Sequence, residues 1–351
     1  MERKEKIVIA LCVAATIAAG ILHYVHVNAI LAFVVTAAAL ALLAMIVGDA
    51  TEQLGSRLGP GATGVLQSSL GNLPELFVCI FALKAGMVGL VQAALIGSIL
   101  GNALLVFGLA LFLGGLKNGT QTFRSEPPKM IATLMILAVA ALMIPTLAKE
   151  LHTPAADHVD SLDIVSAIVL LVLLAANVYF SVKGDPAVVL QTAESGHAEW
   201  SMGLAIGVLA CAGFGAAFVS DWFVASLEPV MTRFGLSEAF TGLVVVAIAG
   251  NSIENLVGIQ FAWRNQADYA ISIMLNSSLQ IALGLIPILV LLSFVLGGSI
   301  LTLVLPPMLV ASLALAAIVN AFIVYDGESI WLEGLALIGL YCIIAASFWW
   351  G

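Results

Sequence analysis

Long apolar runs separated by short polar stretches fill the whole chain. A transmembrane helix needs about 20 consecutive apolar residues, and eleven runs are close to that length. They are residues 7–25, 28–50, 61–83, 86–114, 130–148, 162–182, 202–225, 241–263, 269–296, 301–324 and 331–350. The longest polar link, residues 183–201, is too short to form a soluble domain. The pattern predicts an all-α, polytopic membrane protein with about 11 transmembrane helices, surrounded by a lipid bilayer.

The composition indicates the same class. Of the 351 residues, 62% are hydrophobic and only 9% are charged, whereas about a quarter of the residues in soluble domains are charged. The net charge of −9 excludes nucleic acid as a partner, because no basic patch is available to neutralise phosphates. An acidic balance instead favours the attraction of cations. The cysteines stand alone in apolar runs and are interpreted as small hydrophobic residues: Cys12, Cys79, Cys211 and Cys342.

The distribution of Lys and Arg predicts the orientation in the membrane. With a cytoplasmic N-terminus, nine of these residues fall inside: Arg3, Lys4, Lys6, Arg57, Lys117, Arg124, Lys129, Lys183 and Arg264. Three fall outside: Lys84, Lys149 and Arg233. Because cytoplasmic loops carry an excess of positive charge, we expect an integral protein of the cell membrane or an inner membrane, with the N-terminus cytoplasmic and the C-terminus outside.

An internal repeat divides the chain. The segment Gly71-Asn72-Leu73-Pro74-Glu75 recurs as Gly250-Asn251-Ser252-Ile253-Glu254, at an offset of 179 residues. The same offset aligns Asp49 with Glu228 and Ser98 with Ser277. Each copy contains five apolar runs, and an odd number of crossings inverts the second copy relative to the first. We therefore expect an N-terminal transmembrane helix at 1–26, a first five-helix repeat at 27–183, a cytoplasmic link at 184–201 and a second, inverted repeat at 202–351.

One acidic residue stands near the middle of one apolar run in each repeat. Glu75 is the only charged residue of the run 61–83, and Glu254 is the only one of the run 241–263. A charged side chain at this depth is costly unless it faces a partner or a water-filled cavity, so such residues are functional candidates. The alternative is a protonated glutamate that hydrogen bonds between helices. Their matching positions in the repeat favour an ion-binding and proton-carrying role for both.

Polar residues near the two glutamates are candidate ligands or positioning groups. Gly71-Asn72 and Gly250-Asn251 are expected to loosen the helix before each glutamate. Two further pairs, Ser98 with Asn102 and Asn276 with Gln280, are spaced four residues apart and so share a helix face. Close helix packing with interhelical hydrogen bonds is the alternative for all of these residues. The expected ligands or positioning groups are Asn72, Asn251, Ser98, Asn102, Ser277 and Gln280, with Asn255 and Asn276 as further candidates.

Other acidic residues lie at the expected ends of the apolar runs. Asp49, Glu52 and Glu228 would form vestibules that attract cations, or simply solvated helix ends. The stretch between Glu150 and Asp163 is expected to be a hydrated outside loop; it contains Glu150, His152, Asp157, His158, Asp160 and Asp163.

A site made of oxygen ligands with two carboxylates suits a hard cation, and calcium takes six to eight such oxygens. The expected metal ligands are Glu75 and Glu254, and no His or Cys directly adjoins them in the motifs to favour a softer metal. Protons compete with the cation for the same carboxylates, which couples the two fluxes. The cation and the proton are cargo, and no cofactor is expected.

The motifs resemble those of the cation/proton exchanger (CAX) branch of the calcium:cation antiporter superfamily, over nearly the whole chain. The Gly-Asn-x-x-Glu motif occurs twice, followed first by Gly97, Ser98, Leu100 and Asn102, and then by Ser277, Ser278, Gln280, Ile281 and Ala282. The resemblance implies exchange of cytosolic calcium for protons, with Glu75 and Glu254 carrying the ions alternately. This chain departs from the family pattern at Asn255, where His is common, at Gly101, where Ser is usual, and at Asn276, where Gly is usual.

The sequence thus predicts a secondary transporter and not an enzyme: a cation:proton antiporter that exports calcium. Sodium or potassium in place of calcium is the first alternative, and a cation channel is the second. No Ser/His arrangement or HExxH motif in the runs indicates an intramembrane enzyme. The sequence leaves the oligomeric state open, and a homo-oligomer is compatible with it.

Overall fold

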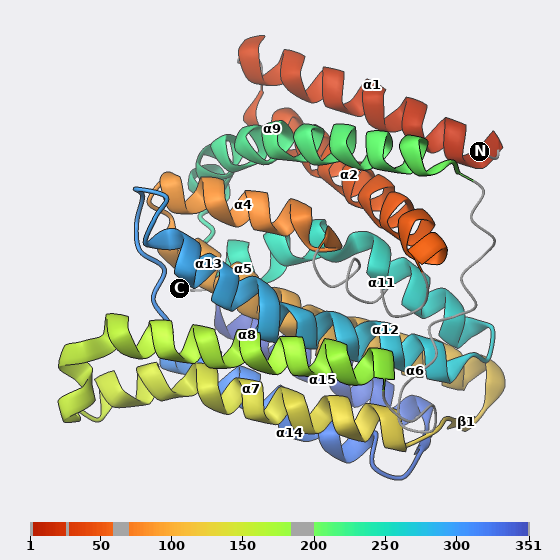
Figure 1. Ribbon diagram of the computed structural model, residues 1–351, viewed down its shortest axis with the longest axis vertical. Helices are drawn as coiled ribbons and strands as arrows, with labels where there is room; N and C mark the ends of the chain where they lie inside the picture. Colours follow the sequence, from red (N-terminus) through yellow and green to blue (C-terminus); the bar gives the residue numbers. More distant parts are fainter. Residues whose placement is uncertain (1–2, 26–27, 59–69, 184–199, 350–351) are drawn as a thin grey trace.

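The computed structural model describes residues 3–25, 28–58, 70–183 and 200–349, and this part of the chain is almost entirely helical (Figure 1). Within it, seven helical stretches are long and apolar enough to cross a membrane, or eight if the bent pair Glu238–Asn251 and Leu256–Trp263 is one span. The predicted membrane class is therefore confirmed, whereas the count of eleven stays a prediction. Most of the expected link, together with the first part of the run 61–83, lies outside the described residues.

The helices are numbered along the chain. The α-helices are α1 (Arg3–Val25), α2 (Ala29–Leu58), α4 (Leu73–Lys84), α5 (Val88–Leu100), α6 (Phe107–Asn118), α7 (Glu126–Glu150), α8 (Val159–Lys183), α9 (Met202–Phe234), α10 (Glu238–Phe240), α11 (Ala247–Trp263), α12 (Ala267–Gln280), α13 (Ile286–Ser293), α14 (Pro307–Ile323) and α15 (Trp331–Ser347). Three π-helical segments are η1 (Gly101–Val106), η3 (Thr241–Val246) and η4 (Ile281–Leu285), and η2 (Pro154–His158) is a 3-10 helix.

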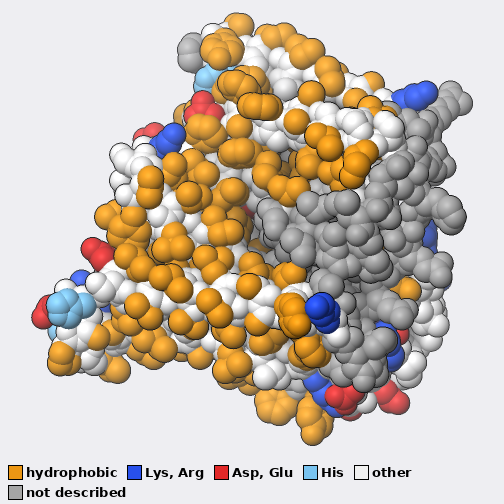
Figure 2. All heavy atoms as spheres, in the orientation of Figure 1, with side chains coloured by type: hydrophobic (Ala, Val, Ile, Leu, Met, Phe, Trp, Pro, Cys, Tyr) orange, Lys and Arg blue, Asp and Glu red, His pale blue; other side chains and the backbone are white. Residues whose placement is uncertain are grey.

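The helices form three groups (Figure 1). Helices α1, α2 and α9 lie together at one side, where α2 packs along α9. The middle of the molecule holds α4, α5 with α6, α11, and α12 with α13. On the other side, α14 packs on α7, α15 on α6 and α8 on α13. The space-filling view has a broad band of hydrophobic side chains, and most of its charged side chains lie towards the left and right edges, as expected of a protein in a bilayer (Figure 2).

The central helices cross at very short distance because glycines remove the side chains between them. A Cβ atom on Gly97 of α5 would overlap the backbone of Leu243 in η3, and one on Gly242 would overlap the backbone of Leu90. The two glycines thus let a helix from the first half of the chain touch the backbone of a segment from the second half.

Two of the π-helical segments interrupt long helices at matched places. Segment η1 lies between α5 and α6, and η4 lies between α12 and α13. Their last residues, Val106 and Leu285, are separated by 179 residues, which is the offset of the sequence repeat. Short π-helical turns inside α-helices are frequent at functional sites, and these two begin three residues after Ser98 and four residues after Ser277.

Two expectations from the sequence were wrong in detail. The helix expected at 301–324 begins only at Pro307. A residue before a proline favours an extended conformation, which Pro306 adopts, and proline is favoured at the first position of a helix, which Pro307 occupies. The expected hydrated loop also ends early: α8 begins at Val159, and Asp163 on its second turn is fully buried.

Among the described residues, the fold departs from all-α at one place. Strands β1 (Gln121–Thr122) and β2 (Glu328–Ser329) form a two-residue antiparallel ladder, in which Gln121 pairs with Ser329. The ladder joins the loop after α6 to the loop before α15. It therefore links the first and second halves of the chain outside the helical core.

The close crossing at Gly97 predicts a large effect of one methyl group. Gly97→Ala should lower the stability by about 1–3 kcal/mol, because the added Cβ would overlap the backbone of Leu243. Gly101→Ala is the matched control, since nothing lies within 4 Å of the Cβ it adds. Thermal unfolding of both purified variants in detergent measures the difference. Equal melting temperatures would contradict the crossing.

Candidate functional site

The first glutamate of the repeat lies at a helix start inside the molecule. Gly71 and Asn72 form a turn, and α4 begins at Leu73 with Asn72 as its N-cap. Pro74 sits in the first turn, where the lack of a backbone N–H costs no helical hydrogen bond. Glu75 is in the same turn, so the partial positive charge of the helix N-terminus favours its carboxylate. The helix interruption predicted before Glu75 is confirmed.

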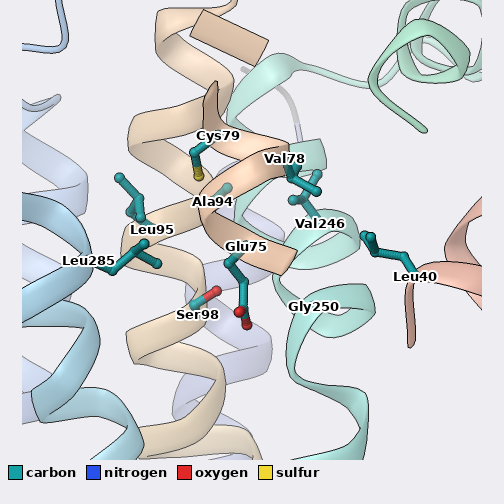
Figure 3. A pocket seen from close by; sticks show the side chains of 10 residues that line it. All are labelled: Leu40, Glu75, Val78, Cys79, Ala94, Leu95, Ser98, Val246, Gly250 and Leu285. Carbon is teal, nitrogen blue, oxygen red and sulfur yellow. The ribbon is translucent and has the colours of Figure 1, made fainter. Parts of the chain in front are cut away.

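The side chain of Glu75 faces a small cavity between the two halves of the chain. Figure 3 shows its carboxylate next to the Ser98 hydroxyl, with the backbone of Gly250 on the other side. The cavity is lined by Leu40, Glu75, Val78, Cys79, Ala94, Leu95, Ser98, Val246, Gly250 and Leu285. The space open to the centre of a water molecule is about 10 Å³, close to what one water needs. The cavity is thus suited to a small ion or a single water.

The second copy of the motif supplies the wall against which Glu75 packs. A Cβ atom on Gly250 would lie 3.0 Å from Cγ and 3.1 Å from Oε1 of Glu75. The absence of a side chain at this glycine therefore makes room for the carboxyl group. The axes of Glu238–Asn251 and Leu256–Trp263 differ by 66°, so the second motif falls at a break in helix direction.

Hydrogen bonds connect the predicted polar residues across the repeats. Asn251 donates from Nδ2 to the Ser98 hydroxyl at 2.9 Å and to the carbonyl of Ala247 at 3.0 Å. Its Oδ1 atom is buried and accepts no hydrogen bond within the described part of the chain. An amide oxygen without a donor is suited to coordinate a cation, and the amide nitrogen of the same side chain bonds to Ser98, which lines the cavity.

A second pair lies deeper, between α5–η1 and α12. Asn102 donates to the Ser277 hydroxyl at 2.8 Å, and both residues are buried. Ser278 is fully buried and donates to the carbonyls of Ile99 and Met274. Gln280, at the end of α12, is half-buried. Each of the two cross-repeat bonds pairs an asparagine with a serine from the other half of the chain.

Several predicted residues lie elsewhere. Asn276 donates to the Ser272 hydroxyl of its own helix at 3.2 Å and does not line the cavity. Asp49 and Glu52 are exposed within α2, and Glu228 is exposed within α9. All three lie before the last turn of their helices, because α2 runs to Leu58 and α9 to Phe234, and their role as a vestibule stays a prediction. The side chains of Glu254 and Asn255 lie outside the described residues.

The sequence interpretation missed the apolar wall of the cavity. Cys79 lines it one helical turn after Glu75, a spacing that places both on one helix face. Leu40, Val246 and Leu285 come from α2, η3 and η4, and nothing local in the sequence marks them. Among the described residues, no three His, Cys, Asp or Glu side chains are grouped to hold a metal ion.

Comparisons with known proteins agree with this arrangement. The family described as sodium/calcium exchanger protein matches residues 28–183 and 204–350. A Ca²⁺/H⁺ antiporter of Bacillus subtilis is 35% identical over 356 residues, covering 99% of both chains. A vacuolar cation/proton exchanger of Oryza sativa subsp. japonica is 32% identical over 343 residues, covering 93% of this chain and 82% of the relative.

The solved structure of native YfkE superposes with a TM-score of 0.83 at 32% identity, covering 97% of this chain and 99% of that one. The predicted resemblance to cation/proton exchangers is thus confirmed over nearly the full length. The chain belongs to the sodium/calcium exchanger protein family, and its relatives include Ca²⁺/H⁺ antiporters and cation/proton exchangers.

Proposed function

We propose that this protein is a calcium:proton antiporter in which Glu75 and Glu254 bind the cation and protons alternately. The observation that carries the proposal is the packing of the Glu75 carboxyl group against Gly250, beside the bonded pair of Ser98 and Asn251. The two copies of the motif thereby meet at one small cavity. The names of the relatives support calcium and protons as the exchanged ions.

The coupling follows from competition for the same oxygen atoms. A divalent cation is held by two ionised carboxylates with neutral oxygens around them, here offered by Ser98 and Asn251. In an apolar interior, the same two carboxylates are stable without the cation only if they take up protons. Binding of calcium therefore requires release of protons, and binding of protons requires release of calcium. This competition by itself links the two fluxes.

The layout proposed from the sequence explains how the site reaches both sides of the membrane. The proposal is a leading helix at 1–26, two inverted five-helix repeats at 27–183 and 202–351, and a cytoplasmic link at 184–201. The repeated motif and the matched π-helical segments support it. Rocking of one helix group against the other around the fixed site would expose the ions alternately. The bias of Lys and Arg supports a cytoplasmic N-terminus.

Replacing either glutamate by glutamine should abolish exchange, because glutamine neither neutralises calcium nor carries a proton. Glu75→Gln and Glu254→Gln are compared with Glu150→Gln, an exposed residue at the end of α7. The measurement is proton movement across proteoliposomes after addition of calcium, sodium or potassium. Exchange that survives in Glu75→Gln would refute the site. Exchange with sodium or potassium alone would keep the site and change the substrate.

The pH dependence follows from the same competition. Below the pH at which the site takes up protons, the apparent KM for calcium should rise about tenfold per pH unit for each proton displaced, by mass action. Initial rates of calcium uptake at a series of pH values, equal on both sides, give the slope. An apparent KM that stays constant from about pH 8 to about pH 5 would contradict competition at the carboxylates.

The amide of Asn251 should matter more than that of Asn276. Asn251→Ala removes both the bond to Ser98 and the buried amide oxygen that accepts no hydrogen bond among the described residues, and should raise the KM for calcium by about tenfold, equivalent to about 1.4 kcal/mol. Asn276→Ala is the matched control, because Asn276 bonds within its own helix. The calcium dependence of exchange in proteoliposomes measures both. Equal effects of the two substitutions would show that Asn251 is not at the site.

A further inference from the structure

A stretch without regular structure crosses the buried part of the molecule. Residues 299–306, here called the strap, form the second part of the connection between α13 and α14 and contain neither helix nor strand. Along it, Leu301, Leu303 and Leu305 are buried, while Thr302 and Val304 between them are half-buried. Backbone groups in a membrane protein need hydrogen-bond partners, because lipid offers none. The strap takes its partners from side chains of four helices.

Four polar side chains hold the strap. Gln92 of α5 donates to the carbonyls of Thr302 and Val304, at 2.9 and 3.1 Å. Thr146 of α7 donates to the carbonyl of Leu303 and accepts from the N–H of Leu305, both at 2.9 Å. Ser293 of α13 accepts from the N–H of Leu301 at 3.0 Å. Asp163 of α8 accepts through Oδ2 from the N–H of Leu303 at 3.1 Å.

Asp163 is the ionisable member of this set. Its exposed fraction is 0%, and its second oxygen, Oδ1, is buried without a hydrogen-bond partner in the described part of the chain. Burial favours the neutral form of a carboxyl group, whereas a backbone N–H favours the charged form. A proton added at Oδ1 would neutralise the group and weaken its charge-assisted bond to Leu303.

The titratable groups of the elements that pack on α8 surround the position of Asp163. Asp160, one turn earlier on α8, interacts with it electrostatically. The other elements that pack on α8 are α7, η2, α13 and η4. Segments α13 and η4 contain no titratable residue, and neither does the strap. The titratable residues of α7 and η2 are Glu126, Lys129, Lys149, Glu150, Asp157 and His158.

The strap lies next to the ion cavity. A small second cavity is lined by Gln92, Leu95 and Ile286 together with strap residues Leu301 to Leu303 and Leu305. Leu95 also lines the cavity of Glu75. Gln92 precedes Ser98 by six residues, or about 9 Å along α5. One leucine side chain therefore faces both the ion cavity and the space under the strap.

We propose that the strap closes the route between the Glu75 cavity and the outer side of the membrane, and that Asp163 is a proton site that releases it. The inference rests on the proposed function. The outer side is the side to which the charge bias assigns Lys84. The strap lies near this side, because the N–H of Ser299 donates to the carbonyl of Leu83 at 3.4 Å. Ionised Asp163 holds Leu303 and keeps the strap in place. A proton arriving from outside binds Oδ1, the hydrogen bond from Leu303 weakens, and the cavity opens where protons enter and calcium leaves.

Cys79 is a built-in reporter for this opening, because it is buried and lines the ion cavity. In a protein with Cys12, Cys211 and Cys342 changed to Ala, the rate of Cys79 modification by a charged, membrane-impermeant methanethiosulfonate is measured from each side of proteoliposomes. The rate measured in the protein that retains Asp163 is divided by the rate measured in the Asp163→Asn variant at the same pH. This ratio cancels the effect of pH on the thiol itself. Asparagine can still accept from Leu303 but does not titrate in this range.

The expected result is a ratio for outside reagent that rises about fivefold or more from about pH 8 to about pH 5.5. Asp160→Asn, on the exposed neighbour, should keep this rise, and Thr146→Ala should speed modification at every pH. Gln92→Ala provides the same test of a loosened strap if Thr146→Ala does not fold.

A ratio that does not change with pH would overturn the proposal, as would an absence of modification from the outside in every variant. Calcium-driven proton flux is recorded in the same vesicles. Calcium-driven proton flux without an effect of pH on the rate of Cys79 modification would refute the proposed opening of the strap alone. An effect of pH on that rate without calcium-driven proton flux would refute the antiporter function and leave the proposed opening of the strap in place.

Discussion

The half-buried side chain of Glu75 lies between the two halves of the helical core, and its packing against Gly250 is the constraint around which this part of the core is arranged. An ionised group in an apolar interior costs several kcal/mol unless opposite charge or hydrogen bonds compensate it. The helix N-terminus at Asn72 favours the charged form of this carboxyl group, and the Ser98 hydroxyl lies next to it. In the proposed function, a bound cation or proton also compensates the charge, and the cost of burying a carboxylate becomes the basis of ion binding.

Close approach of the two halves is what brings these groups together. Gly97 and Gly242 let α5 and η3 touch backbone to backbone, and the asparagine-serine bonds then join Asn251 to Ser98 and Asn102 to Ser277. In a bilayer the hydrophobic effect does not drive helices together, so close packing and interhelical hydrogen bonds carry the association. The same contacts that stabilise the fold therefore also fix the positions of the proposed ligands Ser98 and Asn251.

Much of this site was predictable from the sequence because the repeat marks it twice. Glu75, Ser98 and Asn251 stand in short, unusual motifs at matched positions, and polar residues in apolar runs are conspicuous. The strap was not predictable, since residues 301–305 form an apolar run that resembles part of a helix, and most of its hydrogen-bond partners come from three helices that are distant in the sequence. Asp163 was assigned to a hydrated loop for the same reason: its burial depends on the strap that covers it. Asn276 shares a helix face with Gln280, yet its amide donates a hydrogen bond to the hydroxyl of Ser272, one turn earlier in the same helix.

The central claim is that calcium and protons occupy the same carboxylates. The most direct test is to count the protons released when calcium binds to the purified protein in detergent, using a weakly buffered solution with a pH indicator dye. The account predicts that calcium binding releases protons, and that Glu75→Gln both weakens the binding and reduces the release. Tight calcium binding without proton release, or proton release unchanged in Glu75→Gln, would contradict it.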